Sequence, residues 1–209
     1  MHRLLLAPES IENVTGRTAK PVFVVTGPSG AGKGTLISLV LPRFPVLRHA
    51  VSATTRPQRP GEEDGREYWF LSDDEFARRV GEDGFLEWVW YVGNRYGTLL
   101  SEIDRIRDEG GAPLLELETE GALAVKDKVP GAVTIFVTAP VAELERRLRE
   151  RATESTGAIA DRIDLARRQL EQAGRFDYVV ENDDRERAAD ELAEIVERAL
   201  AAAATMSRP

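Results

Sequence analysis

The stretch GPSGAGKGT has the residue types and spacing of a phosphate-binding loop. It lies between an apolar run, residues 21–26, and residues 33–41, whose apolar spacing is helical. Glycines let the backbone curl so that several N–H groups face one anion, and a helix start adds partial positive charge. Lys33 would neutralise the oxygens of a β- or γ-phosphate. The loop therefore predicts binding of a nucleoside triphosphate, without indicating what receives the phosphate.

Every residue of this loop is a candidate contact for the triphosphate. The set is Gly27, Pro28, Ser29, Gly30, Ala31, Gly32, Lys33, Gly34 and Thr35. A strict motif has Ser or Thr directly after the lysine, where it contacts Mg²⁺. This chain has Gly34 there, so we expect Mg²⁺ to be held mainly by phosphates and water, with Thr35 as the candidate side-chain ligand. The alternative is a glycine-rich strand–helix turn that binds nothing.

A second stretch, SATTRPQRPGE, carries two arginines, Arg56 and Arg59, between prolines that exclude a helix. Guanidinium groups match phosphate oxygens in a bidentate fashion. Tyr68 and Tyr96 could add hydroxyl donors to the same ligand. This arrangement indicates a clamp for a phosphate that the acceptor already carries, as in a kinase acting on a nucleoside monophosphate.

A carboxylate, Glu87, stands among apolar and aromatic residues in FLEWVW, where it is costly unless paired. Guanine offers N1–H and a 2-amino group side by side, and one carboxylate can accept both, whereas adenine does not offer that pattern. Ser52 and Thr98 could also hydrogen-bond a base edge. Strand alternation could equally point Glu87 to solvent, and the spacing alone leaves both possibilities open.

A third group of arginines lies in ERRLRERATESTGAIADRI. Arg147 and Arg151 are four residues apart, hence on one helix face, and Arg162 begins a later helix. A small, polar segment separates them. A flap that closes over both substrates would supply positive charge to the moving phosphoryl group and exclude water. The alternative is a solvated helix with Arg–Glu pairs.

Composition limits the remaining possibilities. The 209 residues suffice for one sizeable α/β domain, and the net charge of −8 argues against a surface that coats nucleic acid. The chain has no cysteine and only His2 and His49, so a thiolate or histidine metal centre and a Ser-His-Asp triad are disfavoured. No run approaches the ~20 apolar residues of a membrane helix. We expect a cytoplasmic protein without a nucleic-acid or membrane partner.

Strands alternate with helices along the chain. The expected strands are 21–26, 46–52, 113–118, 132–137 and 177–182, and the expected helices are 33–41, 98–109, 120–128, 141–151, 158–173 and 185–203. This alternation predicts an α/β fold, a parallel sheet with helices on both faces.

The predicted domain organisation has five parts. They are a flexible leader at 1–20, one domain at 21–204 with its core at 21–52 and 98–204, an inserted nucleotide-binding subdomain at about 53–97, a lid at about 147–162, and a tail at 205–209. The insertion is recognised by its turns and aromatic residues, which interrupt the rhythm of strands and helices.

The sequence resembles the guanylate kinases over nearly all of residues 21–198. The likeness lies in GPSGAGKGT, SATTRPQRPGE, FLEW followed by GNRYGT, LELETEGA, RRLRER and VVENDD, in that order. It implies a P-loop nucleoside monophosphate kinase fold with an inserted small α/β subdomain and an arginine-rich lid. It also implies ATP-dependent phosphorylation of GMP, and of dGMP, by direct in-line transfer with Mg²⁺, in a monomer or homodimer.

The resemblance also implies a role for individual residues. The residues implied to hold the GMP phosphate are Arg56, Arg59, Tyr68 and Tyr96, with Glu62 orienting their loop. The residues implied to address the rest of GMP are Ser52, Glu87, Thr98, Glu116 and Glu118. The residues implied to act in catalysis are Lys33, Arg56, Arg147, Arg151 and Arg162, and Asn182 would lie near the adenine.

Some positions depart from the family pattern. The family often has Asp at the position of Glu118, Gln at that of Glu120, and glycine at that of Ala152.

Three alternative functions remain. They are a guanylate kinase-like binding module without activity, a related kinase acting on a phosphorylated sugar, and an adenylate-type kinase. The intact phosphate loop disfavours the first, the candidate base contacts disfavour the second, and Glu87 disfavours the third.

Overall fold

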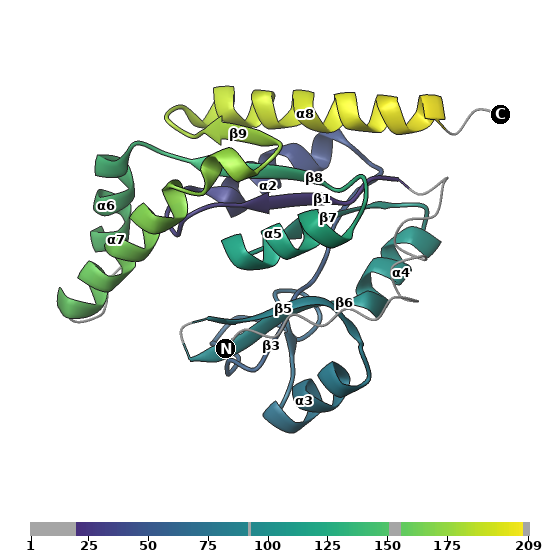
Figure 1. Ribbon diagram of the computed structural model, residues 1–209, viewed down its shortest axis with the longest axis horizontal. Helices are drawn as coiled ribbons and strands as arrows, with labels where there is room; N and C mark the ends of the chain where they lie inside the picture. The colour runs from purple at the N-terminus through teal and green to yellow at the C-terminus, as the bar shows by residue number, and fades with distance from the viewer. Residues whose placement is uncertain (1–19, 92, 151–155, 207–209) are drawn as a thin grey trace.

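The computed structural model describes residues 20–91, 93–150 and 156–206, and it has two sheets (Figure 1). Residues 1–19 of the expected leader lie outside the described residues, as do 151–155 of the expected lid, Arg151 and Ala152 included.

The larger sheet is built from the strands that the alternating pattern predicts. Its strands are β1 (Phe23–Thr26), β2 (Leu47–His49), β7 (Ala112–Glu116), β8 (Val133–Thr138) and β9 (Tyr178–Glu181). They lie in the order β2-β7-β1-β8-β9, and every neighbouring pair is parallel. The predicted α/β fold with a parallel sheet is confirmed.

Helices cover both faces of this sheet (Figure 1). They are α2 (Lys33–Val40) and α8 (Arg185–Met206) on one face and α4 (Leu100–Asp108) and α5 (Thr119–Lys128) on the other. Two further helices, α6 (Val141–Glu150) and α7 (Thr156–Leu170), lie together at one end of the sheet and extend away from it (Figure 1). Short 3₁₀ turns lie at Leu41–Arg43 and Ala173–Arg175. The last helix continues into the expected tail. No helix in the described part of the chain is long and apolar enough to cross a membrane.

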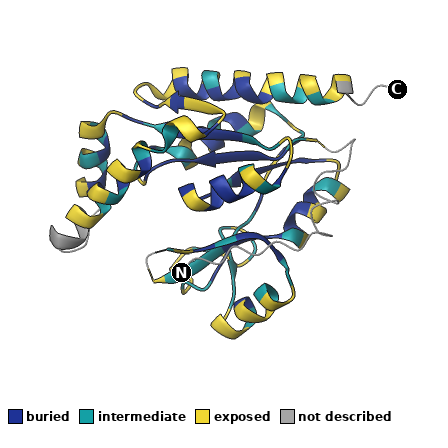
Figure 2. Cartoon of the chain, in the orientation of Figure 1, coloured by how far each residue is buried: buried dark blue, intermediate teal, exposed yellow. Residues whose placement is uncertain are grey.

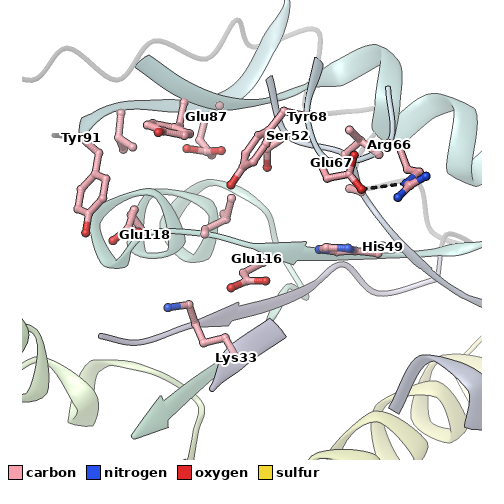
Figure 3. Close-up of a pocket in the computed structure, with 16 residues that line it drawn as sticks. Lys33, His49, Ser52, Arg66, Glu67, Tyr68, Glu87, Tyr91, Glu116 and Glu118 are labelled. Carbon is pink, nitrogen blue, oxygen red and sulfur yellow. Dashed lines mark hydrogen bonds and ion pairs between the residues drawn. The ribbon is translucent and has the colours of Figure 1, made fainter. Parts of the chain in front are cut away.

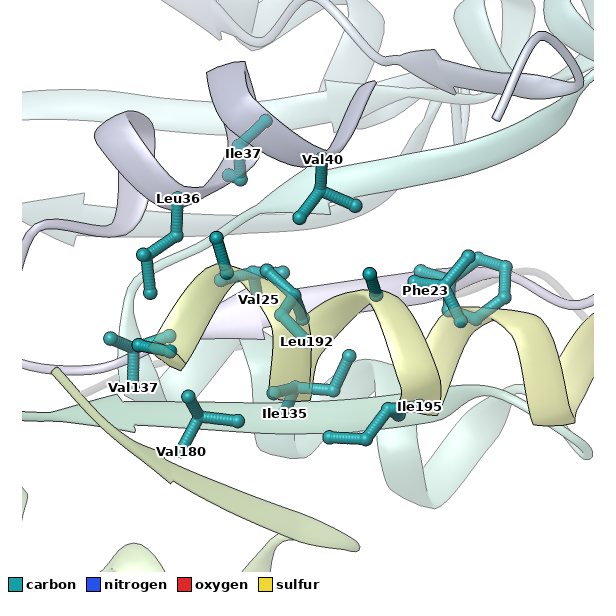
Figure 4. Close-up of a cluster of buried hydrophobic side chains, with 14 of the residues drawn as sticks. Phe23, Val25, Leu36, Ile37, Val40, Ile135, Val137, Val180, Leu192 and Ile195 are labelled. Carbon is teal, nitrogen blue, oxygen red and sulfur yellow. The ribbon is translucent and has the colours of Figure 1, made fainter. Parts of the chain in front are cut away.

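Strand alternation divides the core into two layers, because successive side chains point to opposite faces. Phe23 and Val25 of β1 pack with α2 and α8, whereas Val24 packs with α4 and α5 on the other face. Figure 4 shows the first layer, with side chains of α2 and α8 meeting those of the strands. The burial pattern in Figure 2 agrees, since α8 is buried on the side that faces the sheet. Burial on both faces explains why the inner strands β1, β7 and β8 are mostly apolar runs.

The smaller sheet lies between β2 and β7 in the chain. Its strands are β3 (Ala53–Thr54), β4 (Trp69–Phe70), β5 (Phe85–Tyr91) and β6 (Asn94–Leu99), in the order β4-β3-β6-β5. One helix, α3 (Asp73–Gly81), packs against it, and Ser72 caps that helix by accepting a hydrogen bond from the Glu75 amide at 3.1 Å. Phe76 of α3 stacks on Phe85 of β5, with 4.4 Å between ring centroids, in a small separate core.

Candidate functional site

A cavity of about 220 Å³, which we call the central cavity, lies between the two sheets. The larger sheet contributes the carboxyl ends of β2 and β7, which is where α/β folds usually bind ligands. The residues that line it are Lys33, His49, Ala50, Val51, Ser52, Arg66, Glu67, Tyr68, Glu87, Val89, Tyr91, Tyr96, Gly97, Glu116, Leu117 and Glu118. In Figure 3, Glu87, Ser52 and Tyr68 face Lys33 and Glu116 across this space. Seven of the predicted site residues therefore share one cavity: Lys33, Ser52, Tyr68, Glu87, Tyr96, Glu116 and Glu118.

The phosphate loop connects β1 to α2 in a conformation that its glycines permit. Gly27, Gly30 and Gly32 have φ of 139°, 87° and 89°, which side chains rarely adopt. A Cβ on Gly27 would also lie 2.0 Å from the Val137 carbonyl oxygen. The Lys33 ammonium donates to the Gly27 carbonyl at 2.8 Å, so its charge lies over its own loop.

Two side chains from distant elements brace this loop. Asn182, buried just beyond β9, donates its side-chain amide to the Ala31 carbonyl at 2.7 Å. Arg147 of α6 donates to the Gly30 carbonyl at 3.1 Å and to the Glu143 carboxylate at 2.7 Å. Arg147 therefore lies on the phosphate loop, as the flap hypothesis requires.

A second cavity of about 380 Å³, the loop-side cavity, opens on the other side of the phosphate loop. The residues that line it are Gly30, Gly32, Thr35, Arg147, Glu150, Asn182, Asp183 and Arg185. Sequence reasoning selected five of these residues and missed Glu150, Asp183 and Arg185. Asp183 directly follows Asn182 and Arg185 is three positions after it, which was the available signal.

The arginine loop is organised by one carboxylate. Glu62 accepts from the Arg56 guanidinium at 2.9 Å and from the Arg59 backbone amide at 2.8 Å. The hydrogen bond from Arg56 is the largest cause that lowers the pKa of Glu62 below its usual range, and the bond from the Arg59 amide is the next. The Arg56 guanidinium also lies 5.3 Å from the centroid of the Tyr68 ring. Tyr68 in turn is 6.0 Å from the Tyr96 ring, so Arg56 and both tyrosines form one group, whereas Arg59 is exposed at its edge.

The structure resolves the alternative for Glu87, because this side chain is only 2 % exposed and faces the central cavity. A β-bulge between Phe85 and Glu87 shifts the strand register. Such a bulge re-aims side chains, so Phe85 can fill the small core while Glu87 points the other way. The Thr98 hydroxyl donates to the carboxylate at 2.9 Å. Burial nevertheless raises the pKa of Glu87 to about 7, against the effect of that hydrogen bond.

Two further carboxylates lie near the phosphate loop. Burial raises the pKa of Glu118, while the Lys33 charge and a 3.3 Å hydrogen bond from Gln169 oppose the rise. A Glu116 oxygen is 3.6 Å from the position that a Cβ on Gly34 would take. Glu120, a further departure from the family pattern, is exposed and does not line the central cavity.

The described part of the lid also reaches the site. Burial raises the pKa of Tyr91 to about 12, and the nearby charge of Arg162 on α7 opposes the rise. The charge of Arg162 therefore acts on Tyr91, which lines the central cavity. Leu148 of α6 packs with Ile163 and Ala166 of α7, which holds these two helices together.

The cavity contains residues that sequence reasoning did not select. His49 and Val51 lie within the strand predicted at 46–52, near its carboxyl end, while Arg66 and Glu67 follow the arginine loop. Their positions at strand ends and next to motifs were weak signals. Tyr91 gave none, because it belongs to an aromatic stretch in which Phe85 is buried and Trp90 is exposed, so the sequence does not show which way Tyr91 points.

Comparisons with known proteins agree on one family. A sequence model described as Guanylate kinase matches residues 18–199. Guanylate kinase of Rubrobacter xylanophilus is 48% identical over 181 residues, which are 86% of this chain and 95% of that protein. Guanylate kinase of Desulfitobacterium hafniense is 44% identical, over 84% of this chain and 88% of its own. The crystal structure of guanylate kinase from Anaplasma phagocytophilum superposes with a TM-score of 0.70 at 26% identity, covering 88% of this chain and 87% of that chain.

Proposed function

The chain belongs to the guanylate kinase family, whose reaction is the ATP-dependent phosphorylation of GMP to GDP, and we propose that its two cavities divide the substrates. In this proposal GMP occupies the central cavity, ATP lies along the phosphate loop, and the loop-side cavity takes the remainder of ATP. Direct in-line transfer needs no catalytic base, because the attacking GMP phosphate oxygen is already an anion.

The single observation that carries the acceptor assignment is the buried carboxylate of Glu87. It accepts a hydrogen bond from the Thr98 hydroxyl at 2.9 Å, and its two oxygens have further lone pairs, which leaves acceptor capacity at the central cavity. The N1–H and 2-amino groups of guanine would satisfy that capacity together. Adenine would leave the carboxylate unpaired in a buried position, which is a large penalty. Ser52 lines the same cavity and would add a contact to the base.

The group formed by Arg56, Tyr68 and Tyr96 supports the placement of the GMP phosphate. Glu62 holds the Arg56 guanidinium by a bond of 2.9 Å and the backbone amide of Arg59 by one of 2.8 Å, so one residue organises the loop. A guanidinium held in this way loses little freedom when a phosphate binds, which favours affinity. We propose that Arg59 turns its exposed side chain to the same phosphate.

The oxygen donors near Lys33 fit a magnesium ion. Mg²⁺ prefers oxygen ligands and usually combines one or two carboxylates with phosphate oxygens and water. Glu116 lies beside Gly34 at the start of α2, and the Thr35 hydroxyl is on the first turn of the same helix. When bound with ATP, the ion would neutralise charge on the transferring phosphoryl group.

The remaining assignments concern the donor and the lid. Lys33 and the loop amides would hold the β- and γ-phosphates, with Arg147 adding positive charge from α6. Asn182 supports the phosphate loop through Ala31 and lines the loop-side cavity, so we assign it to loop positioning beside the adenine. We propose that Arg162, together with Arg151, completes the lid. Use of dGMP, the oligomeric state and a cytoplasmic location stay predictions.

The phosphate assignment is tested by steady-state kinetics of Arg56→Lys. A lysine keeps the charge and loses the bidentate fork, so KM for GMP should rise about tenfold, equivalent to about 1.4 kcal/mol. KM for ATP should change less than about twofold. The matched control is Arg78→Lys on α3, an exposed arginine whose partners Glu75 and Glu82 lie on and just after that helix. An equal rise of both KM values would contradict the assignment.

A further inference from the structure

The chain crosses between the two sheets twice, and the crossings lie side by side. On the way out, the Ala50 amide makes the last hydrogen bond to the larger sheet, to the Leu114 carbonyl at 2.9 Å. The smaller sheet begins at Ala53. On the way back, β6 ends at Leu99 and α4 begins at once. Residues 51 and 52 are therefore the whole outgoing connection.

A buried carboxylate of α4 joins these two crossings. Glu102 is 3 % exposed, and its Oε1 accepts a hydrogen bond from the Val51 amide at 3.0 Å. Arg105, one turn later on α4, donates to the same carboxylate at 2.9 Å and 3.1 Å. A hydrogen bond to an ionised acceptor is stronger than one between neutral groups. The returning helix α4 thus holds the two-residue outgoing connection through the Val51 amide.

The hydrogen bond from the Val51 amide to Glu102 fixes part of the wall of the central cavity. Val51 and its neighbour Ser52 both line that cavity, whereas Glu102 does not. Glu102 itself therefore stays outside the chemistry, and its effect on the acceptor runs through the backbone of residues 51 and 52. Its neighbours on α4, Ile103 and Ile106, are fully buried, so the helix that carries it is fixed to the larger sheet.

We propose that Glu102 is a positioning residue for the acceptor nucleotide, which fixes the pivot between the two sheets. The proposal rests on the placement of GMP in the central cavity. With the bond intact, both crossings move as one unit, and the smaller sheet keeps a narrow range of orientations over the phosphate loop. Without it, the Val51 amide loses its partner and the outgoing connection can rotate independently of α4.

Kinetics of Glu102→Ala and Glu102→Gln test the effect on the acceptor. Glu102→Ala should raise KM for GMP about tenfold, equivalent to about 1.4 kcal/mol, and change KM for ATP less than about twofold. Glu102→Gln retains an oxygen for the Val51 amide, so it should recover most of this loss. The matched control is Glu109→Ala, since Glu109 is exposed and pairs with the same Arg105 at 2.8 Å. An equal rise of both KM values would overturn the proposal.

A second measurement does not depend on substrate. The chain has no cysteine, so Ala77→Cys on α3 and Ala142→Cys on α6 introduce a unique pair of exposed labelling sites. Electron spin resonance should show a broader distance distribution when Glu102→Ala is added, and a nearly unchanged one with Glu102→Gln. An unchanged distribution with Glu102→Ala refutes the pivot. A broader distribution without a change in KM for GMP supports the pivot and points instead to a fault in the placement of GMP.

If Glu102→Ala does not fold, Arg105→Gln replaces it in both measurements. This variant leaves the carboxylate in place and removes the fork that orients it. It should raise KM for GMP about threefold and broaden the distance distribution, because the carboxylate is then held by the Val51 amide alone. No change in either measurement would overturn the proposal.

Discussion

Replacing Glu87 by glutamine should make the protein more stable and worse at recognising guanine. The substitution keeps the size of the side chain and one oxygen for the Thr98 hydroxyl, which donates at 2.9 Å. It removes a negative charge that is buried in the central cavity beside a neutral hydroxyl group. A buried charge of this kind opposes folding, and binding of guanine is what compensates it.

The size of the effect follows from the pKa of Glu87. Burial raises this pKa from 4.5 to about 7 in the folded protein. The folded state then binds more protons than the unfolded state between these two values, so the stability of the ligand-free protein falls as pH rises through that range. Since one pKa unit corresponds to about 1.4 kcal/mol, the loss amounts to roughly 3 kcal/mol at pH 8 and about 1 kcal/mol at pH 5. Glutamine does not titrate and avoids this loss.

The assay is urea unfolding of both proteins at pH 5 and pH 8, without nucleotide. Glu87→Gln should be more stable by roughly 3 kcal/mol at pH 8, with the difference shrinking to about 1 kcal/mol at pH 5. GMP affinity, measured in parallel, should fall at pH 8 in the variant. Equal stability at both pH values, or a variant that is less stable at pH 8, would refute the account of Glu87 as an uncompensated buried acid.

Three further substitutions test the phosphate loop. Gly27→Ala places a Cβ 2.0 Å from a carbonyl of β8 at a φ of 139°, so urea unfolding should show a loss of at least about 3 kcal/mol. Arg147→Lys removes the fork that reaches Gly30, so kcat should fall about tenfold or more with KM for GMP unchanged. Asn182→Ala removes the bond to Ala31, so KM for ATP should rise about tenfold.

For each of these three substitutions, a specific result would contradict the prediction. Unchanged unfolding of Gly27→Ala would mean that the loop has another conformation in solution. An Arg147→Lys variant with normal kcat would place this arginine in loop support alone. A rise in KM for GMP in place of KM for ATP would contradict the assignment of Asn182 to the donor side. The control for all three is Arg149→Lys, an exposed α6 arginine that pairs with Glu145.

The inner strands of the larger sheet could be predicted from the sequence because they are buried on both faces. Runs such as residues 21–26 and 132–137 are apolar throughout, and β1 and β8 form within them. The smaller sheet was expected only as an insertion. β3 and β4 are two residues long, and β4 pairs in parallel with a strand that precedes it by a long loop. Such pairings leave no periodic pattern in the sequence.

In the candidate site, too, some residues could be selected from local sequence and others could not. Motif spacing selected Lys33 and Arg56, whose hydrogen-bond partners Gly27 and Glu62 are close to them in sequence. Asn182 was selected only through the resemblance to a family, because its partner Ala31 is 151 positions earlier. The orientation of Glu87 could not be predicted, since it depends on a β-bulge that reverses the simple alternation of β5. Glu102 could not be selected at all. Its partner Val51 is 51 positions earlier in the chain, and only the fold brings the two together.

The most direct test of the central claim is ADP release from ATP and Mg²⁺ with a panel of acceptors: GMP, dGMP, AMP, CMP, UMP and ribose 1-phosphate. Turnover with GMP and dGMP alone is the predicted result, with Glu87→Gln losing the preference for guanine over adenine. Turnover with the sugar phosphate in place of GMP would contradict the reading of the base by Glu87. Tight binding of GMP without any turnover would contradict the assignment of the phosphate loop and its arginines to phosphoryl transfer.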